Sequence, residues 1–293
     1  MKTVKRATLY AILAAALYAV NIPLSKHLLQ QSGATMMAAF LYLGAGVGML
    51  LLSFGRKAAG RGEQKEPLTR KELPYVVGMI VLDSAAPILL MFGLKFTNSA
   101  NASLLNNFES VATSPIALLV FRESISKRLG FAIALVTVAS AILSFEGAGA
   151  FVFNRGSLLV LGAAACWGLE NNCTKMISNK SSEEIVIIKG LFSGFGSLVV
   201  AVCLGESLPA MKWLLAILLL GFVAYGLSIY FYVMAQNHLG AAKTSGYYSI
   251  APFLGVAFSL LLLGEKPGPQ FYLGLAVMAV STVLMVKDSL QQS

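Results

Sequence analysis

The chain has 293 residues and a net charge of +9, and its composition excludes a soluble globular protein. Hydrophobic residues make up 57% of the sequence and charged residues 12%, roughly half the charged share of an ordinary soluble domain. So few charged side chains cannot cover a soluble fold of this size, and the same composition excludes disordered, collagen-like and coiled-coil chains. The mean hydropathy of +0.76 therefore indicates an integral membrane protein with many spans.

Ten apolar runs approach the length of about 20 residues that a transmembrane helix needs. They cover residues 7–26, 34–54, 73–94, 100–121, 129–147, 156–177, 184–204, 212–235, 241–263 and 270–286. They lack the alternation over about ten residues that is typical of a β-barrel strand. We therefore predict an all-α integral membrane fold with ten transmembrane helices. The fourth run is the least regular, since Asn106, Asn107 and Glu109 interrupt it.

Basic residues lie mainly in the short gaps between the runs, which favours the positive-inside rule over binding of nucleic acid. If the N-terminus is cytoplasmic, the inside segments hold 14 lysines and arginines and the outside loops hold 4. This bias predicts a multi-pass protein of the cell (inner) membrane, with an even number of spans and both termini in the cytoplasm.

The sequence repeats itself in two halves. Residues 16–26 line up with residues 165–175 at an offset of 149, and Ser103 and Glu123 line up with Ser245 and Glu265 at an offset of 142. A Gly-xxx-Gly pattern recurs in the second and seventh runs, at 44–48 and 190–194. Each half then holds five spans, residues 1–147 and 155–287. Because five is odd, the second copy is inverted in the membrane, which is typical of secondary transporters.

Three groups of residues carry a resemblance to a known family. They are Ala15–Tyr18 with Lys26, Ala163–Gly168 with Lys175, and Leu239–Lys243 followed by Ala251–Pro252 and Leu263–Glu265. On these residues the chain resembles the drug/metabolite transporter (DMT) superfamily, in its EamA type, over about residues 8–287. The resemblance implies a ten-helix transporter of two five-helix repeats, in a family that exports amino acids, other metabolites and drugs. The first half departs from the family pattern, because Ser110 stands where proline is usual and Arg122–Glu123 replaces Gly-Glu.

Ionisable residues inside the spans are the candidates for substrate or coupling sites, since charge is costly in hydrocarbon. Glu109 shares a polar stripe of the fourth run with Asn106, and Asn107 widens it. The stripe predicts a cavity lining, with a helix–helix hydrogen-bond seam as the alternative.

Two further carboxylates lie within spans. Glu170 shares a face of the sixth run with Trp167 and Asn171, and Asp83 lies near the middle of the third run. Burial favours the neutral form of a carboxylate, so Glu170 is a candidate proton-exchanging group. The alternatives are a structural pair of Glu170 with a nearby lysine and a structural hydrogen bond for Asp83.

The lysines and aromatic residues of the spans have less specific interpretations. Lys26, Lys175 and Lys189 are expected to extend to the membrane interface, while Lys243 at the start of the ninth run is as much a site candidate as a structural residue. The aromatic candidates for a cavity wall are Tyr18, Trp167, Tyr247 and Tyr248. Packing in the core or in an interfacial belt is the alternative for each of them.

Motifs of other functional classes are missing from the sequence. We find no Walker loop, no HExxH and no GxSxG, and the three cysteines are too scattered for a metal motif. We therefore predict a protein that is not an enzyme and has no catalytic residue, metal or cofactor. The alternative from another class is a membrane-embedded lipid-handling protein or enzyme.

These observations predict a secondary transporter, an exporter of a small polar or amphipathic organic metabolite that works by alternating access. Proton coupling and uncoupled facilitation both stay open. A multidrug or quaternary-cation exporter stays open too, because the cavity candidates include acids and aromatic rings. The expected partners are a small-molecule substrate, the lipid bilayer and protons, while the sequence does not choose between a monomer and a homodimer.

Overall fold

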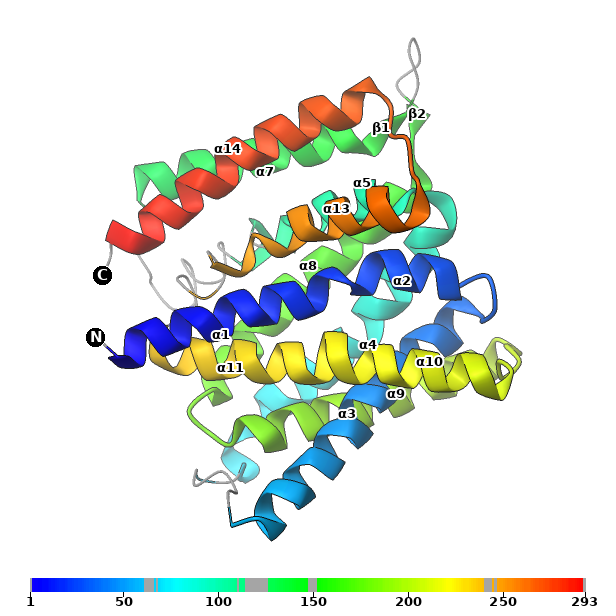
Figure 1. Ribbon diagram of the computed structural model, residues 1–293, viewed down its shortest axis with the longest axis vertical. Coiled ribbons are helices and arrows are strands. Elements are labelled where there is room, and N and C mark those ends of the chain that lie inside the picture. Colours follow the sequence, from blue (N-terminus) through cyan, green and yellow to red (C-terminus); the bar gives the residue numbers. More distant parts are fainter. Residues whose placement is uncertain are drawn as a thin grey trace.

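The computed structural model describes residues 2–60, 66, 68–109, 111–113, 126–146, 152–239, 244 and 247–291, and helices dominate it (Figure 1). The long helices are α1 (Lys2–Ala19), α2 (Asn21–Leu28), α3 (Ala34–Ala58), α4 (Leu73–Phe96), α7 (Lys127–Ser144), α8 (Arg155–Ile177), α9 (Ser182–Cys203), α10 (Met211–Gly221), α11 (Ser228–Leu239), α13 (Ala251–Leu263) and α14 (Pro269–Gln291). The shorter elements are η1 (Arg70–Glu72), α5 (Ser99–Leu105), the π-helical turn η2 (Phe222–Leu227), and the strands β1 (Phe145–Glu146) and β2 (Val152–Phe153).

The predicted all-α membrane fold is confirmed. Seven helical stretches among the described residues are long and apolar enough to span a bilayer, and they match the first, second, third, fifth, seventh, eighth and tenth predicted runs. Helices α8 and α13 match the sixth and ninth runs, and α5 begins the fourth. The one strand pair among the described residues is a two-residue antiparallel contact of β1 with β2, at the junction of the halves.

The helices pair across the two halves of the chain. Helix α3 packs on α9, α5 on α13 and α7 on α14, so three runs contact their own repeat partners. Helix α4 packs on α8, and α1 packs on α11. Because α1 and α8 are repeat partners, as are α4 and the span that includes α11, the repeat turns each of these pairs into the other. This is the packing of two similar units around a twofold axis. Figure 1 shows both termini at one end of the bundle, as an even number of crossings requires.

The contact of α3 with α9 shows that the repeat partners run in opposite directions. A Cβ at Gly190 would lie 2.3 Å from the nitrogen of Gly46, and a Cβ at Gly194 would lie 2.7 Å from the nitrogen of Leu43. The α9 glycines therefore form the expected close contact. In α3 the residue that faces α9 is Gly46, whereas Gly44 meets the backbone of Leu218 on α10.

Gly190→Ala should destabilise the fold by about 1–3 kcal/mol, because its methyl group meets backbone of α3 that cannot move aside. Thermal unfolding of the purified protein in detergent measures this. Gly55→Ala in α3 is the control, because it is also a helical glycine and a Cβ there meets nothing within 4 Å. Equal melting temperatures for the two variants would contradict the close contact.

Prolines and one wide turn interrupt the helices near the centre of the bundle. The break between α1 and α2 at Val20 precedes Pro23, whose ring nitrogen cannot donate to the carbonyl of Ala19. Pro252 lies in the first turn of α13, while α4 continues through Pro87. The π-helical turn η2 contains Tyr225, and such turns are frequent at functional sites.

Candidate functional site

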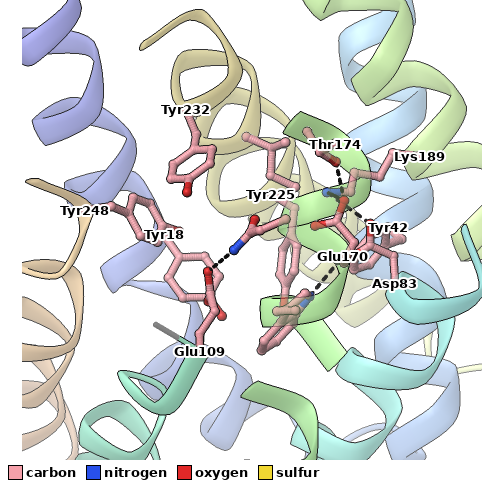
Figure 2. A pocket seen from close by; sticks show the side chains of 13 residues that line it. Tyr18, Tyr42, Asp83, Glu109, Glu170, Thr174, Lys189, Tyr225, Tyr232 and Tyr248 are labelled. Carbon is pink, nitrogen blue, oxygen red and sulfur yellow. Dashed lines mark hydrogen bonds and ion pairs between the residues drawn. The ribbon is translucent and has the colours of Figure 1, made fainter. Parts of the chain in front are cut away.

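A cavity lies between the two halves, where α1, α3, α4, α8, α9, η2 and α11 converge (Figure 2). It encloses about 510 Å³ of space free of atoms, part of it continuous with solvent. Its lining residues are Tyr18, Tyr42, Asp83, Glu109, Trp167, Glu170, Asn171, Thr174, Lys189, Tyr225, Ile229, Tyr232 and Tyr248. Both repeats contribute to every part of the wall, which is the arrangement expected of a transport site.

One wall of the cavity is a buried cluster of three charged side chains. Lys189 Nζ on α9 lies 3.0 Å from Asp83 Oδ2 on α4 and 2.9 Å from Glu170 Oε1 on α8. The three side chains are 5%, 0% and 1% exposed. A lysine that meets two carboxylates balances only one of their charges, so the ionised cluster keeps one negative charge.

Polar neighbours hold this cluster in place. The Tyr42 hydroxyl donates to Asp83 Oδ1 at 2.8 Å, and Trp167 Nε1 donates to the Tyr42 oxygen at 3.3 Å. The Thr174 hydroxyl donates to Glu170 Oε1 from one turn further along α8. Because Trp167, Glu170 and Thr174 share one helix face, α8 supplies one acid of the cluster, the hydroxyl that holds it, and the indole that holds Tyr42.

Glu109 is the carboxylate without a cationic partner. Its Oε1 accepts a hydrogen bond from Asn171 Nδ2 at 2.5 Å, and no lysine or arginine nitrogen among the described residues forms an ion pair with it. Figure 2 shows Glu109 beside Tyr18 and apart from the cluster around Lys189. Its charge is thus open to a ligand or a proton.

Aromatic rings form the rest of the wall, and Tyr18 lies at their centre. Its ring centroid is 6.3 Å from that of Trp167, 5.8 Å from Tyr225 and 5.9 Å from Tyr248. Tyr232 meets Tyr248 edge to face at 5.0 Å. Such rings offer apolar faces and hydroxyl groups to the same ligand, and their faces attract cations.

A second chain of hydrogen bonds fixes Tyr225 in the π-helical turn. Asn21 Nδ2 donates to the Tyr225 oxygen at 2.9 Å, and Ser25 Oγ donates to Asn21 Oδ1 at 3.0 Å. Asn21 and Ser25 are fully buried at the break between α1 and α2. The interrupted first span therefore holds the interrupted eighth span in place.

The structure brings together most of the residues predicted from the sequence. Those that line the cavity are Tyr18, Asp83, Glu109, Trp167, Glu170, Asn171 and Tyr248. Asn106 lines a second, smaller pocket beside it. Asn107 is buried but lines neither pocket, Tyr247 lies outside both linings, and Lys243 lies outside the described residues.

Two lysines differ from the prediction. Lys189 does not extend to the membrane interface, because Asp83 and Glu170 compensate its charge inside the protein. The alternative of a structural lysine pair therefore describes the geometry of Glu170. Lys26 also turns inward, where Nζ donates to the backbone carbonyls of Leu94 and of Thr97, the latter at 2.7 Å. It caps the C-terminal end of α4, whose carbonyls attract a cation.

Six lining residues were not among the site candidates predicted from the sequence. They are Tyr42, Thr174, Lys189, Tyr225, Ile229 and Tyr232. Lys189 could have been found from the sequence, because it is a cation within a span and two other spans each contain a carboxylate that could pair with it. The tyrosines carry no such signal, since a lipid-facing or packed tyrosine looks the same in sequence.

The charges of the cavity are unbalanced. Among the described lining residues, Asp83, Glu109 and Glu170 are the acids and Lys189 is the only cation. Two uncompensated negative charges would be costly in a cavity shielded from water. Such a site lowers its energy by binding protons or a cation, and it disfavours anions.

Comparison with known proteins gives concordant matches. The profile of the EamA-like transporter family matches residues 5–145 and 154–287. An uncharacterized transporter of Methanothermobacter thermautotrophicus is 25% identical over 274 residues, which cover 87% of this chain and 78% of the relative. The uncharacterized transporter YvbV of Bacillus subtilis is 23% identical over 284 residues, covering 94% and 90%.

A solved crystal structure has the same fold. It shares 16% sequence identity with this chain, gives a TM-score of 0.71, and the superposition covers 97% of this chain and 96% of that one. Two family matches, one in each half, agree with the helix pairing described above. The chain therefore belongs to the EamA-like transporter family.

Proposed function

We propose that the protein is a secondary exporter that carries a small amphipathic organic solute through the central cavity by alternating access. The observation that carries this proposal is the wall of the cavity, where three carboxylates and six aromatic rings from both repeats surround one space. An amphipathic solute would place its apolar part against the rings. Its polar end would meet Glu109 and Asn171, the acid and the amide that the lysine does not contact.

We further propose that transport is coupled to protons. Glu109 has no cationic partner among the described residues, so its charge is relieved by a proton or by the substrate. Because a proton and the substrate compete for this one carboxylate, the flow of protons in one direction is linked to the flow of substrate in the other. Because protons return to the cytoplasm down their gradient, the solute would leave it.

A quaternary-cation exporter is the second candidate. The rings of Tyr18, Tyr248 and Tyr232 gather near one unpaired carboxylate, which suits a permanent positive charge. The two candidates differ in the ligand, since a quaternary cation needs no hydrogen-bond partner. If the protein is a quaternary-cation exporter, tetramethylammonium and tetraphenylphosphonium should bind to it. If the substrate is a polar metabolite, neither cation should displace that metabolite.

Reconstituted protein tests the function. Proteoliposomes with an imposed pH gradient are offered a panel of labelled metabolites and both quaternary cations, and accumulation is compared with liposomes without protein. We expect accumulation of at least one small solute that collapses when an ionophore removes the gradient. If the solute only equilibrates across the membrane and does not accumulate, the protein is a facilitator and not a coupled exporter.

The orientation of the chain is a separate prediction. Reporter fusions after Ser293 and within residues 55–72 should both report the cytoplasm, because the basic residues gather on that side. Reporter activity measured in whole cells decides this. A signal from the outer side at either position would reverse the proposed topology.

Tyr248→Ala should weaken substrate binding by about tenfold, since loss of an aromatic contact of roughly 1–1.5 kcal/mol has that effect. Binding is measured per monodisperse protein for the solute found in the screen. Tyr247→Ala is the matched control, because Tyr247 is the next residue and lies outside the cavity lining. Equal affinities of both variants and the unmodified protein would remove Tyr248 from the site.

A further inference from the structure

A second pocket lies beside the central cavity, and Tyr18 belongs to the lining of both. It comprises about 190 Å³ of space free of atoms, part of it continuous with the surroundings, between α1–α2, α5 and α13. Its wall includes Asn106, Ser103 and Pro252. Tyr18 is the residue that the two linings share.

The second pocket contains an unused hydrogen-bond acceptor. Asn106 is only 5% exposed, and its Oδ1 has no hydrogen-bond partner among the residues that the structure describes. Its Nδ2 is 3.5 Å from the Tyr18 hydroxyl, so that contact is weak. A buried carbonyl oxygen without a partner costs about 1–3 kcal/mol. A ligand group that donates a hydrogen bond would remove this cost.

Beyond this pocket, two of the charged side chains near the ends of α2 and α13 bind the backbone of neighbouring elements. Lys26 from α2 binds the last carbonyls of α4, at Leu94 and Thr97. Glu265 accepts from the nitrogens of Ser99 and Ala100 at the start of α5, each at 2.9 Å.

The turn after α13 allows Glu265 to reach the start of α5. Gly264 has a φ of +61°, a conformation that favours glycine, and it reverses the chain so that Glu265 meets α5. Lys26 and Glu265 thus connect α2 and α13 to the two sides of the turn between α4 and α5. These elements also surround or adjoin the second pocket.

We propose that the second pocket is a further binding station of the transport path, between the central cavity and the end opposite the termini. It takes the hydrogen-bond-donating end of the solute, an ammonium or hydroxyl group, at Asn106. Tyr18 closes it toward the central cavity, and the contacts of Lys26 and Glu265 close it toward the far side. This inference rests on the proposed transport function.

Cysteine accessibility tests the path without a known substrate. In a protein whose Cys166, Cys173 and Cys203 are replaced by serine, Asn106→Cys reports the pocket. A membrane-impermeant trimethylammonium methanethiosulfonate is applied to the far side in whole cells and to the side of the termini in inverted vesicles. Lys26→Met or Glu265→Gln should raise labelling from the far side by about tenfold, because charge-assisted bonds that close this end are lost.

Matched variants keep the result specific. Lys26→Arg retains a donor, so Asn106→Cys should still label slowly in that variant. Ala139→Cys on α7 is fully buried and lies outside both pockets, so its labelling should not respond to Lys26→Met. Tyr18→Ala should raise labelling of Asn106→Cys from the side of the termini. The proposal is overturned if monodisperse Lys26→Met and Glu265→Gln proteins both label from the far side no faster than the parent. Labelling as expected without gradient-driven accumulation would instead reject the proton coupling alone.

Discussion

Lys189→Met should destabilise the folded protein by about 3–5 kcal/mol, because it leaves two buried carboxylates without their cation. Asp83 and Glu170 each lie within 3.0 Å of the Lys189 nitrogen and are almost completely shielded from solvent. Methionine fills a similar volume, so loss of packing contributes little. Thermal unfolding in detergent measures the effect, and Lys95→Met, an exposed lysine, controls for loss of charge in general.

Neutralising the carboxylates should restore most of that stability. Asp83→Asn and Glu170→Gln combined with Lys189→Met leave no buried charge in the cluster, and the amides keep the partners Tyr42 and Thr174. Buried ion pairs are often replaced at little cost when all members are exchanged together. A triple variant as unstable as Lys189→Met alone would show that the lysine acts through packing.

Glu109→Gln should abolish accumulation driven by a pH gradient while substrate exchange between the two sides continues. Glutamine keeps the shape and the contact with Asn171 but fixes the charge at zero, so no proton is carried. The measurement compares gradient-driven accumulation with counterflow in the same proteoliposomes.

Glu170→Gln is the matched comparison from the other repeat. Glu170 is paired with Lys189, so its exchange should lower stability more than it lowers coupling. If Glu109→Gln accumulates substrate like the unmodified protein, Glu109 is not the coupling group. If Glu170→Gln alone loses accumulation, the charged cluster carries the proton instead.

Hydrophobic length and basic loops are strong signals, and they were sufficient to predict the fold class. A bilayer requires each span to satisfy its own backbone, so a run such as 34–54 has few alternatives to a helix. The domain boundaries at 147 and 155 stay a prediction. The repeat was visible because the same motif recurs at Tyr18 and Trp167, and both rings line the cavity.

The site was less predictable, because a sequence does not show which spans meet. Lys189 has the sequence position of an interfacial lysine, but α9 packs on α4 and α4 packs on α8, so Asp83 and Glu170 reach its nitrogen. Asn106 and Asn107 are neighbours in sequence, yet successive helical residues point about 100° apart. Only Asn106 therefore reaches a pocket.

The π-helical turn η2 accommodates extra length in the eighth span between two fixed contacts. On one side of the turn, Gly221 packs against the Leu41 carbonyl, where a Cβ would lie 2.0 Å from the oxygen. On the other side, Ser228 Oγ donates to the Ala14 carbonyl at 2.8 Å. A π-helical turn holds more residues than an α-helical turn of 3.6, so deleting one residue between them would allow a regular α-helix that still reaches both contacts. Tyr225 lies within the turn, so such a deletion would change its direction relative to the cavity while the two ends of the span stay in place.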